Sequence, residues 1–229
     1  IAISGDVIRT ADWNLNLWAN ATHYKNKITR LPQPFVTGGI FRFVEGQSAY
    51  TYYLREFAGV DAATGFGSWY AGDVDPISGL SVGEKTTVST HSSATQFLSN
   101  KSAHPDLYGG FGFDVDYKGF FLTTQFSFVK DMWRVDSDYG GFLNTADIGT
   151  FNKTRALHDS WTPTNTDAEY PSLKNTNEFF QTISDRNLRD ASYVRLRYVT
   201  LGYNFSKKNL APLKLSGLRI YGQAENLIT

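Results

Sequence analysis

The side chains that most often carry catalysis are few in this sequence and are not grouped. It contains no cysteine, so thiolate nucleophiles, thiolate metal sites and disulfides are all excluded. Neither an H-E-x-x-H nor a G-x-S-x-G pattern is present, and the histidines are scattered; they are His23, His91, His104 and His158. The sequence therefore predicts no catalytic residues and no enzymatic activity.

Two short segments resemble ligand-binding motifs but lack a residue that the chemistry needs. In "GDVDPISG", Asp73 and Asp75 have the D-x-D spacing of a calcium loop, but Ile77 stands where a further oxygen ligand belongs. In "GFGSWYAG", Tyr70 takes the place of the third glycine of a dinucleotide-binding loop, and no strand-to-helix pattern surrounds it. We therefore expect ordinary turns and loops here, with no metal and no cofactor.

A set of charged residues is arranged differently, because each member alternates with apolar neighbours. In "DASYVRLRYVTLGYNF", for example, Arg195 and Arg197 alternate with Val194 and Leu196. Such alternation places charges on one face of a strand and apolar side chains on the other. Charges on such a face can pair with one another, hold a neighbouring domain or line the path of a solute. The candidates for a polar inner face are Asp114, Asp116, Arg195, Arg197, Arg219 and Glu225.

Aromatic residues in the segments between the predicted strands are candidates for contact with a substrate. Aromatic rings stack on sugar rings and pack against peptide side chains. The alternative is that these rings stabilise long loops or lie at a membrane interface. The candidates are Trp69, Tyr70, Trp133, Trp161 and Tyr170.

The composition narrows the class of protein. Lysine and arginine number 22, as do aspartate and glutamate, so no net charge favours binding to nucleic acid. A hydrophobic content of 41% excludes wholesale disorder, and the 15% of aromatic residues with 20 glycines is typical of β-structure. We therefore expect an all-β protein.

Alternation with a period of two residues marks the elements that position the charged residues. The apolar parity changes between Leu196 and Val199, which predicts a β-bulge near Tyr198. The alternation predicts six strands, which lie within Ile1 to Val7, Trp13 to Thr22, Leu107 to Tyr117, Leu122 to Phe128, Asp190 to Phe205 and Leu218 to Glu225.

The connections between these strands alternate between short and long. The short ones are "RTAD", "YKG" and "SKKNLAPLKLSG", whereas the long ones run roughly from Lys25 to Pro105 and from Asp131 to Ala191. Strands of about 9 to 11 residues with one apolar face, joined by short turns at one end and long loops at the other, are typical of an outer-membrane β-barrel. The apolar face would contact lipid and the polar face a lumen.

Two further observations bear on this interpretation. No run of 18 apolar residues is present, and "IAISGDVIRT" has no basic region or cleavage site, which indicates a mature start or an internal piece. The alternative fold is a soluble β-sandwich, whose strands also alternate. The two long loops on one side, with many glycine and aromatic residues on the outer face, favour the barrel.

The last part of the chain resembles a known family. "LRDASYVRLRYVTLGYNFSKKNLAPLKLSGLRIYGQAENLIT" resembles the late-barrel signature of SusC/RagA-type TonB-dependent outer-membrane transporters. That signature runs S-Y-L/V-R-L-[KR]-x-[LV]-T-L-G-Y, then a basic turn, then L-R-[IV]-Y-x-x-[AG]-x-N-L. Nearly every position is filled.

Three earlier stretches match the same family in order. "VEGQSAYTYYLREFAGVDAATGFGSWY" is similar to its loop ending in G-V-D-x-x-T-G, and "HPDLYGGFGFDVDYKGF" to its P-x-x-Y-G-G-F strand. "WTPTN" is similar to its W-x-P-x-N loop. The resemblance thus covers most of the chain.

The resemblance implies a plugged transmembrane β-barrel of roughly 22 strands, of which about six are present here. Six strands cannot close around so wide a lumen, and open sheet edges in lipid leave backbone groups without partners. We therefore expect residues 1–229 to be part of one TonB-dependent transporter β-barrel domain in the bacterial cell outer membrane. The plug domain and the closing strands are absent from this sequence.

The function implied is nutrient import, with uptake of a glycan or oligopeptide. The implied partners are a SusD-like surface lipoprotein, outer-membrane lipid, and TonB acting through the plug region that this sequence lacks. One alternative is a SusC-like barrel that serves as a structural or interaction component of a larger outer-membrane assembly. The other is a soluble glycan-binding β-domain, whose apolar faces would pair into a dry core.

Overall fold

The computed structural model describes residues 1–146, 148–174 and 183–229, which form two compact units. The first, here called the sheet unit, comprises Ile1–Tyr24, Pro105–Asp131 and Ala191–Thr229. The second, here called the loop unit, comprises Lys25–His104 and Met132–Asp190. Among the described residues, no helix is both long enough and apolar enough to cross a membrane.

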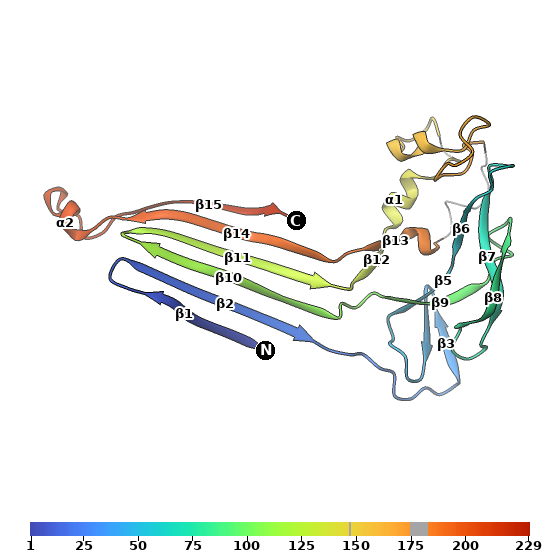
Figure 1. Ribbon diagram of the computed structural model, residues 1–229, viewed down its shortest axis with the longest axis horizontal. Helices are drawn as coiled ribbons and strands as arrows, with labels where there is room; N and C mark the ends of the chain where they lie inside the picture. Colours follow the sequence, from blue (N-terminus) through green and yellow to red (C-terminus); the bar gives the residue numbers. More distant parts are fainter. Residues whose placement is uncertain (147, 175–182) are drawn as a thin grey trace. The chain divides into compact units, whose positions relative to one another are not determined.

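The sheet unit is built on one antiparallel sheet with the strand order β1-β2-β10-β11-β14-β15 (Figure 1). All six strands predicted from the alternation are confirmed, and the described part of the sheet is open because β1 and β15 form its two edges. The strands are β1 (Ala2–Arg9), β2 (Trp13–His23), β10 (Leu107–Tyr117), β11 (Phe120–Lys130), β14 (Tyr193–Asn204) and β15 (Arg219–Ile228).

The predicted irregularity in β14 is also present. Phe126 pairs with Leu196, whereas its neighbour Gln125 pairs with Tyr198, so Arg197 is an extra residue on β14. The pairing of β14 with β15 shifts at the same place, and Asn226 of β15 has a positive φ of 52° there. Asparagine tolerates this left-handed conformation better than most residues. The bulge therefore explains the change of apolar parity along β14.

The short connections all lie at one end of this sheet. Lys118 (φ 47°) and Gly119 (φ 96°) form the two-residue turn between β10 and β11, where positive φ at both positions matches the twist of the strands. Residues 205–218 join β14 to β15 and contain the short helix α2 (Lys207–Leu210) and the 3-10 helix η3 (Ala211–Leu213).

Both long connections leave from the opposite end. The last residue of β2, His23, pairs with the first residue of β10, Leu107, which in turn pairs with the end of β11. Because Val129 of β11 pairs with Tyr193 of β14, the second long connection begins and ends at this same end of the sheet. The sequence-based prediction that both long connections share one end of the sheet is confirmed.

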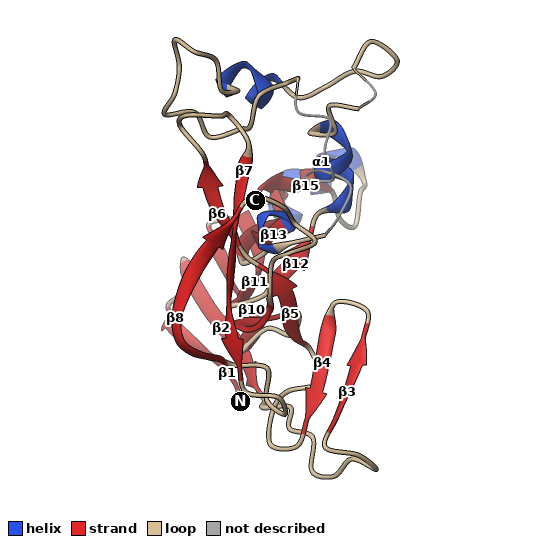
Figure 2. Cartoon of the chain, turned by 90° about the vertical axis from the view of Figure 1, so that its right-hand side faces the viewer, coloured by secondary structure: helices blue, strands red, loops and turns tan. Residues whose placement is uncertain are grey.

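The loop unit has more regular structure than expected, since the alternation indicated no strands there. Its sheets have the strand orders β3-β4-β5-β9, β6-β7-β8 and β12-β13. Figure 2 shows the hairpin formed by β3 and β4. Most of these strands are too short to show a sustained period. They are β3 (Phe35–Gly38), β4 (Phe41–Val44), β5 (Thr51–Arg55), β6 (Phe57–Val60), β7 (Gly67–Val74), β8 (Ser81–Val88), β9 (Gln96–Ser102), β12 (Trp133–Val135) and β13 (Leu188–Asp190).

The two long connections fold together into this one unit. Tyr52, Leu54 and Ala103 of the first connection share an apolar core with Leu188 of the second. The hydroxyl of Tyr52 also donates a hydrogen bond of 3.0 Å to the carbonyl of Trp133. The described part of the unit also contains three short helices; they are α1 (Ser137–Phe142) and the 3-10 helices η1 (Arg155–Asp159) and η2 (Asp185–Asn187).

Candidate functional site: a sheet with two unlike faces and a folded loop unit

One face of the six-stranded sheet, here called the apolar face, is lined by apolar side chains from every strand. Cross-strand pairing places Leu15, Val115, Leu122 and Leu201 in one row, because directly paired residues share a face. These apolar side chains are not packed into a core: Leu201 is 59% exposed. Others on this face that are more than one third exposed are Ile3, Ile8, Trp13, Leu17, Phe111, Phe120, Val194, Ile220 and Ile228.

The row of the apolar face next to the short turns is aromatic. Trp13 pairs with Tyr117, and their rings stack with centroids 4.2 Å apart. Phe120 pairs with Tyr203, with ring centroids at 4.7 Å, and Tyr203 also contacts Phe205 at 4.9 Å. Tryptophan and tyrosine have an apolar body and a polar tip, which suits the boundary between hydrocarbon and water.

The opposite face, here called the polar face, carries amides, hydroxyls and charges. Asp114 pairs with Asn16 on one side and with Thr123 on the other, and Thr123 pairs with Thr200. Of the six charged residues predicted to share one face, the pairing places five on this polar face; they are Asp114, Asp116, Arg195, Arg219 and Glu225. The sixth, Arg197, is the extra residue of the bulge. Their role toward a lumen stays a prediction.

Charged residues on this face form hydrogen bonds with neutral side chains. Gln223 donates to Glu225 at 3.0 Å, and Thr200 donates to Gln223 at 3.3 Å. Nε of Arg195 lies 3.0 Å from the hydroxyl of Thr229. Within the described residues, none of the six predicted charges makes an ion pair within 4.0 Å. Their charges are therefore not neutralised by one another.

Two aromatic residues on the polar face were not identified as functional candidates from the sequence. Phe121 pairs with Gly202, and a Cβ on that glycine would collide with its ring, so the ring occupies the space beside Gly202 of β14. The guanidinium carbon of Arg219 then lies 3.8 Å from the centroid of Phe121. Trp18 covers Gly112 in the same way. An aromatic residue that breaks the alternation opposite a glycine is the signal that would have revealed them.

The five aromatic candidates of the loop unit have different surroundings. Trp69 is 2% exposed and packs against Ala94, Phe57 and Val88, and Tyr170 lies in a core cluster with Leu143 and Leu157. These two rings serve packing in this conformation. Tyr70, Trp133 and Trp161 are half-buried, and so they retain surface for contact with another molecule.

Trp161 connects two segments that the sequence analysis singled out separately. Its indole nitrogen donates a 3.0 Å hydrogen bond to the carbonyl of Ala62, and its ring covers Gly65 so closely that a Cβ there would collide. Gly65 also has a φ of 72°, and the carboxylate of Asp61 accepts hydrogen bonds from the backbone of this turn. The "WTPTN" and "DAATG" stretches therefore contact each other through Trp161.

A cationic and aromatic cluster is centred on Arg186 of η2. The guanidinium carbon of Arg186 lies 4.4 Å from the ring centroid of Phe57 and 5.0 Å from that of Tyr170. Burial lowers the pKa of Arg186, and it raises the pKa of the Tyr170 hydroxyl to about 12. Burial also raises the pKa of the Asp185 carboxyl, which accepts a 2.9 Å hydrogen bond from the backbone N–H of Phe57.

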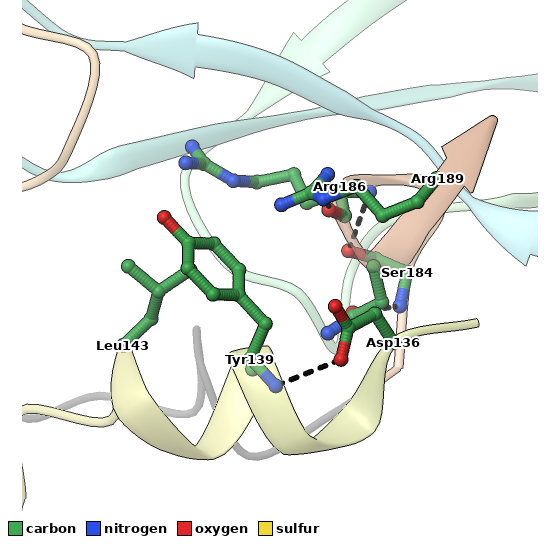
Figure 3. A pocket seen from close by; sticks show the side chains of 8 residues that line it. Asp136, Tyr139, Leu143, Ser184, Arg186 and Arg189 are labelled. Carbon is green, nitrogen blue, oxygen red and sulfur yellow. Dashed lines mark hydrogen bonds between the residues drawn. The ribbon is translucent and has the colours of Figure 1, made fainter. Parts of the chain in front are cut away.

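Figure 3 shows the small pocket next to this cluster. Asp136 caps α1 by accepting a 2.9 Å hydrogen bond from the backbone N–H of Tyr139. The Ser184 hydroxyl accepts a 3.3 Å hydrogen bond from the backbone N–H of Arg186. The pocket has a volume of about 10 Å³, which is room for one water molecule and not for a solute. A larger groove of about 360 Å³ is lined by Phe57, Gly59, Val60, Ala168, Glu169, Arg186 and Arg189.

The described residues contain no group of three or more histidine, aspartate or glutamate side chains that could hold a metal ion. The groups that the two units present are charges and amides on the polar face, and half-buried aromatic rings in the loop unit.

Comparison with known proteins gives one consistent result. No family model matches the chain. The chain is 26% identical over 246 residues to TonB-dependent receptor P3 of Formosa agariphila, covering all of this chain and 23% of that protein. It also superposes on the RagAB peptide importer in its closed-closed state with a TM-score of 0.84 and 27% identity, covering 99% of this chain and 25% of the other.

The open-open state of the same importer gives a TM-score of 0.80 at 24% identity, which shows similarity of fold alone. The chain spans about a quarter of the length of these relatives. Their likeness therefore concerns one portion of a much longer protein.

Proposed function

We propose that this chain is part of a TonB-dependent transporter of the SusC/RagA type and forms wall and loops of an outer-membrane importer. The sheet unit supplies transmembrane strands. The loop unit supplies the connections on the extracellular side. In this proposal both units belong to one β-barrel domain. The proposal includes no chemical reaction, in keeping with relatives that are named as a receptor and an importer.

The observation that carries this proposal is the exposure of the apolar face. Side chains such as Leu201 and Ile220, each 59% exposed, would be costly to leave in water over a whole face. From Trp13 to Ala21 along β2, this face extends about 26 Å at ~3.3 Å per residue, which at a strand tilt of ~40° covers about 20 Å of the ~25 Å apolar band of outer-membrane barrels. A soluble β-sandwich would instead bury these residues against a second sheet.

The polar face then lines the path of the solute. Its amides, hydroxyls and unpaired charges suit a hydrated lumen, and outward apolar residues with inward polar ones are the pattern of such barrels. The aromatic row formed by Trp13, Tyr117, Phe120 and Tyr203 would lie at the periplasmic interface of the bilayer.

The imported solute is an oligopeptide or a glycan, and an oligopeptide is the first class to test because RagAB is named a peptide importer. We propose that a SusD-like lipoprotein captures the solute together with the loop unit, and that TonB supplies the energy. The half-buried rings of Tyr70, Trp133 and Trp161 are the proposed contacts in the loop unit.

The test is uptake of labelled oligopeptides and oligosaccharides by cells that carry or lack the gene encoding this chain, with and without a protonophore. We expect the protein in the outer-membrane fraction, and uptake of one solute class that disappears on deletion and on loss of the proton gradient. Surface binding without uptake would support the alternative of an interaction component. Recovery of the protein without detergent would contradict the membrane assignment itself.

A further inference from the structure

The three short connections of the sheet differ in charge balance. Asp12 in the first and Lys118 in the second form an ion pair at 3.5 Å, and this aspartate raises the pKa of the Lys118 ammonium. The third connection, residues 205–218, contains three lysines and no acidic residue. In the part of the chain that the structure describes, none of these three makes an ion pair within 4.0 Å; they are Lys207, Lys208 and Lys214.

This third connection has a defined conformation that presents the lysines outward. The hydroxyl of Ser206 accepts a hydrogen bond from the backbone N–H of Asn209 and caps α2, while Leu210 is 1% exposed and anchors the segment. Figure 1 shows α2 beyond the ends of β14 and β15. All three lysines are exposed. Their charge therefore faces the surroundings of the sheet end.

Apolar residues are exposed beside these lysines. Leu213 is 65% exposed, Leu215 is 46% exposed and Leu218 is 38% exposed. Leucines and lysines exposed together are the chemistry of segments that lie in the interfacial region of a membrane, where the apolar groups enter the acyl boundary and ammonium groups remain at headgroup level.

The position of the segment agrees with that chemistry. It begins directly after the aromatic row, because Phe205 contacts the ring of Tyr203 at 4.9 Å. It ends where Arg219 starts β15, one residue before Ile220 of the apolar face. If the apolar face contacts lipid, this segment leaves the membrane at headgroup depth.

We propose that residues 205–218 bind phospholipids whose headgroups carry net negative charge, with Lys207, Lys208 and Lys214 at the phosphate and Leu213 and Leu215 against the acyl chains. This inference rests on the proposed membrane function and extends it to a lipid class. Charge complementarity and continuity with the apolar face both favour lipid over a protein partner as the occupant.

The experiment uses the protein that carries this chain, purified from outer membranes in mild detergent. Retention of phosphatidylglycerol, phosphatidylethanolamine and inorganic phosphate would be compared by native mass spectrometry. The test variant combines Lys207→Gln, Lys208→Gln and Lys214→Gln. The matched control combines Lys25→Gln, Lys27→Gln and Lys174→Gln, which removes the same charge from the loop unit.

We expect phosphatidylglycerol to bind more tightly than phosphatidylethanolamine, and to bind the test variant on the order of 100-fold more weakly at low salt, since each lysine near an anionic surface contributes about fivefold. The control variant should bind like the wild type. A second variant, Leu213→Ser with Leu215→Ser, should bind phosphatidylglycerol more weakly and bind inorganic phosphate as the wild type does.

Three results would overturn the inference: equal retention of the two lipids, equal loss in both lysine variants, or loss of solute uptake in the test variant with lipid binding intact. The last would indicate a periplasmic protein as the occupant. Each of these can occur while the wild type stays in the outer membrane and imports its solute. Failure of the proposed function is distinguishable, because the wild type itself would then be absent from the membrane fraction.

Discussion

The sheet unit and the loop unit place large apolar side chains in opposite positions. In the loop unit, large apolar residues lie inside, as shown by Trp69 and Phe97 at 2% and 1% exposed. In the sheet unit, Leu201 and Ile220 point outward at 59%. Among the described hydrophobic residues that are buried, all but Phe121 and Leu210 belong to the loop unit.

This difference fits the proposal that the two units lie in different solvents. The loop unit has its own apolar cores and can hold its shape in water, whereas the sheet unit has almost no interior and depends on whatever covers its apolar face. A substitution from apolar to small should therefore be most harmful in the loop unit, and a substitution from apolar to charged should be harmful on the apolar face.

The largest effect is expected for Trp69→Ala in the loop unit. Removing a buried tryptophan leaves a cavity among Phe57, Val88 and Ala94 and should destabilise this unit by about 3–5 kcal/mol. Hydrogen exchange of the loop unit, compared between variant and wild type in detergent, measures this. Leu17→Ala on the apolar face is the control, because Leu17 is 43% exposed and leaves no cavity. Equal effects of the two variants would contradict the comparison.

The next largest effect is expected for Val199→Arg on the apolar face. Val199 lies four residues from Tyr203 of the aromatic row, in the middle of this face. A charged side chain facing lipid near the bilayer midplane costs about 2–4 kcal/mol, whereas the same charge facing a hydrated lumen costs little. Thr123→Arg on the polar face is the matched control, since it adds an arginine beside Asp114. Urea unfolding in lipid vesicles should show lower stability for Val199→Arg alone. Similar tolerance of both would mean that the apolar face does not contact lipid.

The sequence predicted the sheet far better than the loop unit, for a physical reason. Strands with an apolar face and a polar face alternate over many residues, as in β10, so the pattern defines both strand and face. Strands such as β6 have only four residues, and Phe57 of β6 contacts Asp185 and Arg186 of the other, distant connection. The fold of the loop unit therefore could not be read from local alternation.

The candidate residues divide in the same way. The shared face of Asp114 and Glu225 follows from parity alone, and the bulge at Arg197 was visible as a change of parity. The burial of Trp69 and Tyr170 was not visible, because an aromatic residue in a long connection can serve a core or a binding surface equally well. The aromatic rings placed over Gly202 and Gly112 needed the cross-strand register.

A smaller effect is expected for Trp161→Ala, which tests whether the two long connections act as one body. The variant loses the hydrogen bond to Ala62 and the cover over Gly65, which should cost about 0.5–3 kcal/mol. Limited proteolysis should then cut residues 61–65 faster while Trp161→Phe, which keeps a ring over the glycine, shows an intermediate rate. Unchanged cleavage in both variants would show that this contact does not hold the turn.

The smallest effect is expected for Asp185→Asn, and it depends on pH. Burial, and secondly the nearby Glu56, raise the pKa of the Asp185 carboxyl, while the N–H of Phe57 and the charge of Lys101 lower it. A raised pKa in the folded state means that the stabilising contribution is full below the unfolded pKa of about 3.9 and is lost as the pH rises through the folded value. At neutral pH the buried carboxylate therefore costs stability.

The asparagine variant removes that charge and keeps an oxygen that can accept the hydrogen bond from Phe57. At neutral pH the free energy of unfolding of the variant should therefore equal that of the wild type or exceed it by up to about 1 kcal/mol. As the pH falls, the free energy of unfolding of the wild type should rise relative to that of the variant. The difference in loop-unit stability between the two proteins, measured by hydrogen exchange across this range, isolates Asp185 from the other carboxylates. A variant that is less stable at neutral pH would mean that the charge of Asp185 is needed by Arg186 or Lys101, and that the loop unit is held by electrostatics as well as by its apolar cores.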